Sequence, residues 1–324
     1  MAKQLKLAVS TLIPILILLA PASVFPLQSL TVIEQRILAI FALACLYWVL
    51  EPIPIYATSL LVIFLELVMV SDKGWTFLQS APGTPAYGTM LDYKEIMGTF
   101  SSPIIILFLG GFFLAMATSK YRLDLNLARV MLKPFGRDPR FILLGIMTLT
   151  ALFSMFMSNT ATTAMMFAII HPVLNSFHPE DKGRAGVILG IPFAANIGGI
   201  GTPIGTPPNA IALKYLTGSN AISFGEWMGF GVPYVLFMLA VVWIVLIRLF
   251  PFQTREVILQ IEGRFLTHAK AMVMYITFGV TILLWLTESL HGMNSYIVAV
   301  IPVAVFSITQ VITKEDLKLI SWDV

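Results

Sequence analysis

Two short polar segments interrupt an apolar stretch in the middle of the chain. The first is Ser158-Asn159-Thr160, followed at once by Ala161-Thr162-Thr163, and the second is a run rich in Gly, Thr and Pro at residues 198–209. No Lys, Arg, Asp or Glu occurs at 141–177 or at 185–213, so these segments offer only hydroxyl, amide and backbone groups. We therefore expect both segments to lie at membrane depth.

Backbone that leaves a helix inside a bilayer is tolerated only where protein or a water-filled cavity satisfies its hydrogen bonds. A helix that ends there offers free carbonyl oxygens to a cation, and a helix that begins there offers N–H groups and a positive dipole end to an anion. Ser158-Asn159-Thr160 contains good N-cap residues, and Pro207-Pro208 suits a first helical turn. The two breaks therefore predict a site for a small anion and a coupling cation near the middle of the membrane.

Each break also has a purely structural explanation. Ser158-Asn159-Thr160 could only cap a helix in a hairpin turn, and Gly201 and Gly205 have the four-residue spacing of close helix packing. A dinucleotide-binding loop is excluded, because Ile204 stands where the fingerprint needs its third Gly and no strand precedes it.

The composition indicates a membrane protein, since 58% of the 324 residues are hydrophobic and only 11% are charged. The single cysteine, Cys45, allows neither a disulfide framework nor a thiolate metal site. The net charge of +3 does not indicate a nucleic-acid partner, because the basic residues are sorted by loop and form no patch with aromatic residues. No Ser-His-Asp or metal-binding constellation is evident, so we expect no enzyme.

The apolar segments predict membrane helices at residues 7–25, 37–50, 55–70, 103–118, 227–250, 271–286 and 295–312. The first ends in Ala20-Pro21-Ala22-Ser23 and so also resembles a cleavable signal peptide. The segment 141–177 is expected to be a re-entrant hairpin. The segment 185–217 is expected to be one crossing, broken into helices of roughly 21 Å and 13 Å, and neither alone would cross a core of about 30 Å.

The basic residues predict the orientation of these helices. All but four of the 20 Lys and Arg lie at 1–6, 119–140, 176–184, 248–270 and 313–324. The positive-inside rule places these loops in the cytoplasm, and the six basic residues of 119–140 are the strongest marker. A hairpin and a pair of full spans would give the same count, so the charges do not decide between them.

The motif Ser154-x-x-x-Ser158-Asn159-Thr160, followed later by Gly-Gly-x-Gly-Thr-Pro-x-Gly-Thr-Pro-Pro-Asn at 198–209, resembles the divalent anion:sodium symporter family. These are carriers of dicarboxylates, citrate and sulfate. The runs Trp48-Val49-Leu50-Glu51-Pro52-Ile53-Pro54 and Leu107-Phe108-Leu109-Gly110-Gly111-Phe112-Phe113 also match the first half of that family. The resemblance covers nearly the whole chain.

The resemblance implies ligands for a coupling ion and for a substrate. The sodium ligands would be the side chains of Ser154, Ser158 and Asn159 and the backbone carbonyl of Gly201. The substrate carboxylate would be bound by Asn159, Thr160, Thr202 and Pro203. Na⁺ would serve as the coupling ion.

The expected fold is an all-α polytopic membrane protein, in which the first of two inverted repeats contains the re-entrant hairpin and the broken helix. We expect transmembrane scaffold helices at 1–118, a cytoplasmic basic linker at 119–140, the binding region at 141–224, and further helices at 225–324. The chain ends about where the second repeat would begin, so we expect a truncated chain that lacks the second Ser-Asn-Thr motif, the second cation site and half of the substrate pocket.

The function expected from this resemblance is sodium-coupled symport of a divalent anion, most simply a C4-dicarboxylate such as succinate, malate or fumarate. The carrier would be a homodimer in a lipid bilayer, for which we expect the bacterial inner membrane. Three alternatives remain open. They are a dicarboxylate exchanger that needs no sodium, a carrier of citrate or sulfate, and a membrane fragment or scaffold that does not transport.

Overall fold

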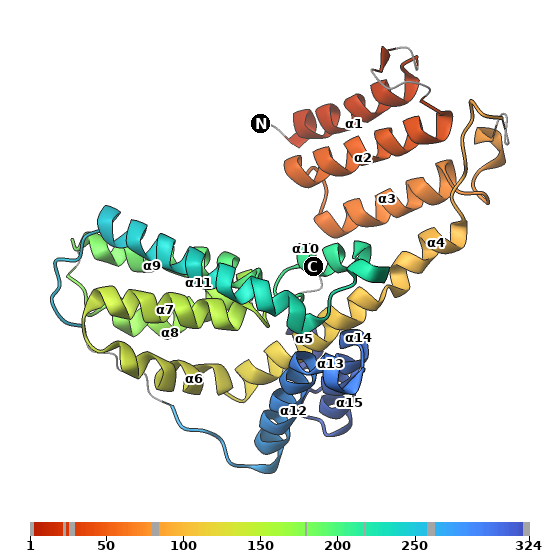
Figure 1. The fold of residues 1–324 in the computed structure, drawn as a ribbon. Coiled ribbons are helices and arrows are strands. Elements are labelled where there is room, and N and C mark those ends of the chain that lie inside the picture. The colour runs from red at the N-terminus through yellow and green to blue at the C-terminus, as the bar shows by residue number, and fades with distance from the viewer. Residues whose placement is uncertain are drawn as a thin grey trace. The chain divides into compact units, whose positions relative to one another are not determined.

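The computed structural model describes residues 3–21, 24–25, 30–79, 84–178, 180–216, 218–257 and 263–319. These residues form helices and no strand, with one isolated β-bridge between Ser71 and Leu91. The prediction of an all-α membrane protein is confirmed. The chain divides into two compact units at the peptide bond between Ser102 and Pro103 (Figure 1).

The first unit contains α1 (Lys3–Leu19), α2 (Val32–Leu50), α3 (Ile55–Met69), η2 (Thr76–Leu78), α4 (Tyr93–Gly98) and η3 (Thr99–Ser101). The helix α2 packs against both α1 and α3. Its start is fixed by a capping box between Thr31 and Glu34. Its C-cap, Glu51, is left-handed with φ 47°, and the following Pro52 prevents the helix from continuing. Of the expected signal-peptide site, Ala22 and Ser23 lie outside the described residues.

A buried arginine holds the polar segment after α3 in place. The guanidinium of Arg36 donates to the carbonyl oxygens of Met69 and Leu78 at 2.7 and 2.6 Å. It also donates to the Tyr87 hydroxyl at 3.3 Å, and it lies over the ring of Tyr87. Neutral oxygens thus surround this cation, and they link α2 to two parts of the segment.

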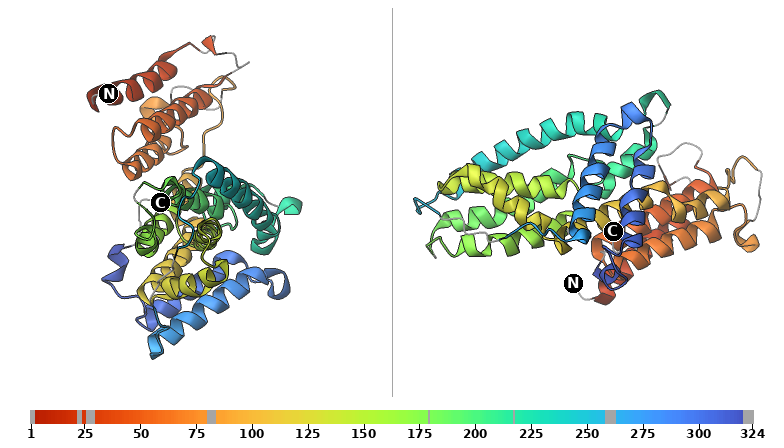
Figure 2. Two further views of the ribbon diagram at one scale, coloured as in Figure 1. Left: turned by 90° about the vertical axis from the view of Figure 1, so that its left-hand side faces the viewer. Right: turned by 90° about the horizontal axis from the view of Figure 1, so that it is seen from below.

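The second unit contains α5 (Pro103–Lys120), α6 (Leu123–Leu132), η4 (Lys133–Phe135), α7 (Pro139–Ser154), α8 (Asn159–Leu174), α9 (Lys182–Gly199), α10 (Pro207–Tyr215), η5 (Gly218–Asn220), α11 (Phe224–Leu249), α12 (Ala269–Leu286), α13 (Glu288–His291), α14 (Ser295–Val298), α15 (Val300–Ile308) and η6 (Asp316–Leu319). One core lies among α7, α8, α9 and α11, and a second lies among α5, α12, α14 and α15. Figure 2 shows these two groups of helices from two further directions.

Close packing in the first core depends on a glycine. The helix α9 packs against both α7 and α8, and α11 covers α7 and α9. At Gly198 a Cβ atom would overlap the backbone of Ala151 in α7. The absence of a side chain at Gly198 therefore lets the end of α9 approach the end of α7, where the two breaks lie.

In the described part of the chain, four helical runs are long and apolar enough to cross a membrane: Val32–Leu50, Tyr93–Lys120, Phe224–Leu249 and Ala269–Leu286. The helices α7 and α8 have 16 residues each, and so each rises only about 24 Å against a core of about 30 Å. Their lengths agree with a re-entrant hairpin better than with two full spans.

Two segments differ from expectation in detail. The expected basic linker at 119–140 contains the helix α6, which packs against α5 and α7 through buried Leu123, Ala128 and Leu132. The expected span at 295–312 is interrupted at Ala299, between α14 and α15. Ala299 faces Gly110 of α5 so closely that a Cβ at position 110 would overlap it.

Candidate functional site

The hairpin turn is built by the end of α7 and the start of α8. The helix α7 ends at Ser154, residues 155–158 form the turn, and α8 begins at Asn159. The Ser158 side chain is the N-cap of α8 and accepts a hydrogen bond from the Ala161 N–H at 3.3 Å. The turn therefore brings carbonyl groups from one helix end and N–H groups from one helix start together, as the sequence predicts.

The second break lies between α9 and α10, at residues 200–206. Residues 201–205 are buried, so their backbone groups need partners within the protein. The amide nitrogen of Asn209, in the first turn of α10, donates to the carbonyl oxygens of Gly199 and Thr202, both at 2.8 Å. Asn209 thus holds the two ends of the broken helix together across the loop.

The two breaks meet. The Thr202 hydroxyl of the loop donates a hydrogen bond to the Met155 carbonyl oxygen, the first residue of the hairpin turn. The Asn159 side chain lies beside the other end of the loop, since a Cβ at Gly199 would be only 2.7 Å from the Asn159 Oδ1. Segments far apart in the sequence thus form one cluster of hydroxyl, amide and carbonyl groups.

The predicted residues differ in their exposure. Ser154 and Thr202 are fully buried, and Pro203 and Gly201 are buried with the rest of the loop. Ser158 and Asn159 are half-buried, and Thr160 is exposed at the start of α8. The cluster therefore has a buried side, where an ion would be held by several groups, and an open side.

The structure brings most but not all of the predicted sodium ligands into contact. The Ser154 hydroxyl donates to the Asn159 Oδ1 at 2.7 Å, so these two groups are neighbours. The carbonyl oxygen of Gly201 lies beside Gly231 of α11 instead, where a Cβ would be 3.1 Å from it. Among the described contacts, no hydrogen bond joins Gly201 or Pro203 to the hairpin turn.

Helix α11 supports the loop, which the sequence did not reveal. The indole N–H of Trp227 donates to the Ile200 carbonyl oxygen at 3.0 Å. One turn further along α11, Gly231 leaves room for the Ile200 and Gly201 carbonyls. A loop at membrane depth thus has one of its free carbonyl groups bound by a neighbouring helix, as backbone in a bilayer requires.

Asn196 is a further polar residue of the cluster that sequence reasoning missed. It lies in the last turns of α9, it is exposed, and its Oδ1 accepts a hydrogen bond from the Asn159 Nδ2 at 3.0 Å. The only signal in the sequence was one amide in the apolar run that precedes Gly198. Asn209 belonged to the recognised motif but had no assigned role.

The chemistry of these groups fits a sodium ion. Hydroxyl, amide and carbonyl oxygens are the ligands that hard cations take, and carriers use unwound helix ends in this way. The segments 141–177 and 185–213 contain no acidic or basic residue, so no protein charge would compete with a bound ion. Ser154, Ser158 and Asn159 would hold the cation, and the free N–H groups at the start of α8 would face an anion.

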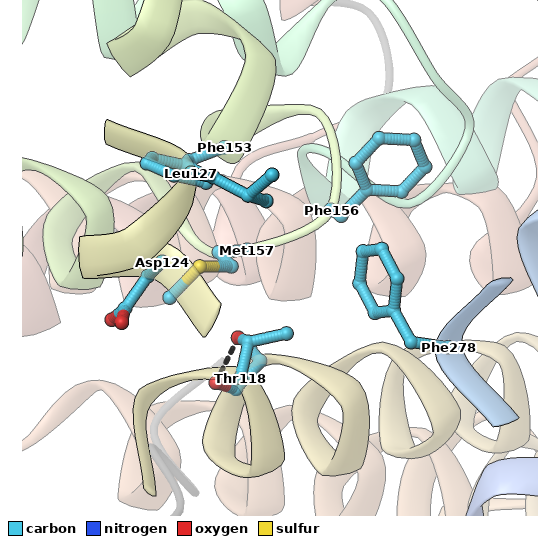
Figure 3. Close-up of a pocket in the computed structure, with 8 residues that line it drawn as sticks. Thr118, Asp124, Leu127, Phe153, Phe156, Met157 and Phe278 are labelled. Atoms are coloured by element: carbon cyan, nitrogen blue, oxygen red, sulfur yellow. Dashed lines mark hydrogen bonds between the residues drawn. The ribbon is translucent and has the colours of Figure 1, made fainter. Parts of the chain in front are cut away.

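Small cavities lie on two sides of the hairpin turn. One of about 20 Å³ is lined by residues of α5, α6, α7 and α12 together with Phe156 and Met157 of the turn (Figure 3). There the rings of Phe156 and Phe278 meet edge to face, with centroids 6.5 Å apart. A second cavity of about 20 Å³ is lined by Ser158, Gly205 and Pro207 together with aromatic residues of α5. The turn is thus less tightly packed than the helices that carry it.

Two carboxyl groups outside the expected membrane spans have shifted pKa values. Burial raises the pKa of Asp124 on α6, against the lowering effect of hydrogen bonds from the Leu125 N–H and the Ser119 hydroxyl. Burial would also raise the pKa of Asp181, but hydrogen bonds from Thr254, Gly183 and Gln253 outweigh it and lower that pKa. Asp181 therefore joins the loop before α9 to the segment after α11 as an ionised carboxylate.

Fold and site together define a class, namely helical integral membrane proteins in which two interrupted helices meet, as in secondary carriers. A family model described as citrate transporter (CitMHS) matches residues 45–324. The chain belongs to this family, which consists of transporters and not enzymes. The resemblance to the divalent anion:sodium symporters is confirmed at this level.

Several relatives have named activities. The sodium-dependent high-affinity dicarboxylate transporter 3 of Caenorhabditis elegans is 33% identical over 74% of this chain and 44% of its own length. The sodium-dependent dicarboxylate transporter SdcS of Staphylococcus saprophyticus is 36% identical over 64% of this chain and 39% of its own length. The inorganic phosphate transporter PHO87 of Saccharomyces cerevisiae is 29% identical over 90% of this chain and 31% of its own length. The chain thus spans less than half the length of each.

Proposed function

We propose that this chain belongs to a sodium-coupled symporter of divalent anions, with a C4-dicarboxylate as the substrate. The observation that carries the proposal is the meeting of the two breaks, in which Thr202 bonds to Met155 and Asn159 lies beside Gly199. This meeting supports one site for two ions of opposite charge. The two sodium-dependent dicarboxylate transporters among the relatives support the choice of ions.

The site residues have the following proposed roles. Sodium is bound by oxygens at the end of α7 and in the turn, from Ser154, Ser158 and Asn159, and by the Gly201 carbonyl once this carbonyl turns toward the hairpin. The substrate carboxylate is bound on the open side, by Asn159 and Thr160 at the start of α8 and by Thr202 and Pro203 of the loop. The remaining groups that a dianion needs come from outside the described residues of this chain or from a longer form of it.

Coupling follows from the neutrality of these groups. A cation held by uncharged oxygens keeps its full charge, and it attracts a carboxylate 4 Å away by about 4 kcal/mol at an effective dielectric constant of 20. Each ion therefore raises the affinity for the other, and by linkage the effect is equal in both directions. Since neither ion meets a fixed opposite charge, both can also leave.

Asn159 gives the direct test, because it is proposed to contact both ions. Purified chain carrying Asn159→Ala is expected to lose sodium-dependent binding of radiolabelled succinate, whereas Asn175→Ala is expected to bind normally. Asn175 is the matched control, because it is exposed at the C-terminal end of the same helix, α8. Unchanged sodium-dependent binding in Asn159→Ala would show that the site is assigned wrongly.

A second candidate substrate is inorganic phosphate, because a relative named as a phosphate transporter matches 90% of the chain. Phosphate is also a divalent anion near neutral pH, so the same site could accept it. Competition separates the two, since succinate is expected to displace labelled phosphate at much lower concentration than the reverse. The sodium-independent exchanger predicts succinate binding that is equal with and without Na⁺, and citrate or sulfate would compete better than succinate if either were the substrate.

A further inference from the structure

Asn196 has an environment that is unusual for a residue on an apolar helix. Its neighbours Ala195 and Ile197 are buried, but Asn196 is exposed and lies on the open side of the cluster. It is outside both motifs that carry the family resemblance. Its side chain is nevertheless joined directly to the centre of the site, through the hydrogen bond from the Asn159 Nδ2 to its Oδ1.

This hydrogen bond determines which way the Asn159 amide faces. The Asn159 Oδ1 accepts from the buried Ser154 hydroxyl at 2.7 Å, and the Nδ2 of the same amide donates to Asn196 at 3.0 Å. An amide has one oxygen and one nitrogen, so fixing its nitrogen at Asn196 fixes its oxygen beside Ser154. Asn196 therefore keeps the Asn159 oxygen among the proposed sodium ligands.

The other half of the Asn196 amide is free to bind an anion. Its Nδ2 carries two N–H groups, and among the described residues no acceptor is hydrogen-bonded to them. These donors are on an exposed side chain, at the end of the cluster where Thr160 is also exposed. Hydrogen bonds from an amide to a carboxylate are charge-assisted and stronger than those between neutral groups.

We propose that Asn196 is a further residue of the anion site, which binds a carboxylate through its Nδ2 and orients Asn159 toward the cation through its Oδ1. This inference rests on the proposed function, because it assumes that a cation and a carboxylate bind at the two breaks. The hydrogen bonds run from Ser154 through Asn159 to Asn196, so one chain of polar groups joins the cation side of the site to its anion side.

The alternative is that Asn196 only fastens the hairpin to α9. Asn196→Asp separates the two roles. The aspartate keeps an oxygen for the Asn159 Nδ2, so the fastening is preserved, but it has no N–H groups for a carboxylate and adds a negative charge. Asn196→Ala removes both the acceptor and the donors. Asn175→Asp and Asn175→Ala are the matched controls at an exposed position of α8.

The test measures each ion separately, at pH 7.5, on the purified full chain. Sodium affinity is measured without substrate, from the rise of the melting temperature with NaCl and from binding of ²²Na⁺. Succinate affinity is measured at saturating sodium with radiolabelled succinate. Asn196→Asp is expected to weaken succinate binding by about tenfold or more, as for one lost charge-assisted hydrogen bond, and to keep or raise sodium affinity. Asn196→Ala is expected to weaken both.

The outcomes distinguish this inference from the proposed function. If Asn196→Asp binds succinate as the wild type and Asn175→Asp do, Asn196 does not contact the anion and the inference is overturned, while the proposed function stands. If Asn196→Asp weakens sodium and succinate binding equally, the residue is only structural and the inference is again overturned. If the wild type shows no sodium-dependent succinate binding, the proposed function fails, and the inference fails with it.

Discussion

Replacing Thr202 by Val tests whether the meeting of the two breaks creates the cation site. Val has nearly the same shape as Thr, so the change removes a hydroxyl from a fully buried position without leaving a large cavity. That hydroxyl donates to the Met155 carbonyl of the hairpin turn and accepts from the Gly205 N–H at 3.1 Å. Both bonds are lost in the variant.

The cost comes mainly from Met155. The Gly205 N–H keeps a second acceptor, the Thr202 carbonyl at 3.3 Å, so it is not left without a partner. The Met155 carbonyl loses the donor that joins the turn to the loop, and a buried acceptor without a partner costs about 1–3 kcal/mol. A loss of about 2 kcal/mol corresponds to about a 30-fold fall in the fraction of molecules in which turn and loop are joined.

Sodium titration in the absence of substrate measures this fall, because Thr202 is also a proposed substrate contact and succinate binding would mix the two effects. The half-saturating sodium concentration of Thr202→Val is expected to rise by about 30-fold. Thr202→Ser, which keeps the hydroxyl, is expected to stay close to the wild type. A valine variant with wild-type sodium affinity would show that the cation site does not depend on the contact between the breaks.

Two further predictions concern Gly199 and Asp181. A Cβ at Gly199 would lie 2.7 Å from the Asn159 Oδ1, so Gly199→Ala is expected to abolish ²²Na⁺ binding; Gly279→Ala, which meets no atom within 4 Å, should leave it unchanged. The pKa of Asp181 is lowered from its ordinary value of 3.8, so its ionised form stabilises the folded chain at neutral pH, and this contribution is lost as the pH falls through the folded pKa. Asp181→Asn should therefore lower the free energy of unfolding by about 1–3 kcal/mol at pH 7, and the difference from wild type, followed by thermal unfolding, should vanish below about pH 3.

The two breaks could be predicted from the sequence because their causes are local. A charge-free apolar run implies membrane depth, and within it Ser158 and the prolines at 207 and 208 favour helix starts. The structure begins α8 immediately after Ser158 and α10 at Pro207, as these residues require. The end of α7 was placed less well, since nothing in residues 155–157 opposes a helix by itself.

The partners of the breaks could not be predicted, because they come from other helices. Trp227 and Asn196 are each ordinary residues of apolar helices until the fold places one beside Ile200 and the other beside Asn159. The same holds for Arg36, whose carbonyl partners are set by the path of a polar segment. Side-chain periodicity reports which face of a helix is apolar, but not which carbonyl group needs a donor. The helix α6 was missed for another reason, since its basic residues drew attention away from an amphipathic pattern.

The position of Asn159 explains why an amide suits this site better than a charged group would. A carboxylate there would bind sodium more strongly, but it could not donate to Asn196, and its charge would repel a divalent anion. An ammonium group would favour the anion and exclude the cation. The amide presents an oxygen to the Ser154 side and N–H groups to the Asn196 side, so it serves both ions without a net charge. Affinity for each ion then depends on the presence of the other, which is the condition for coupled binding.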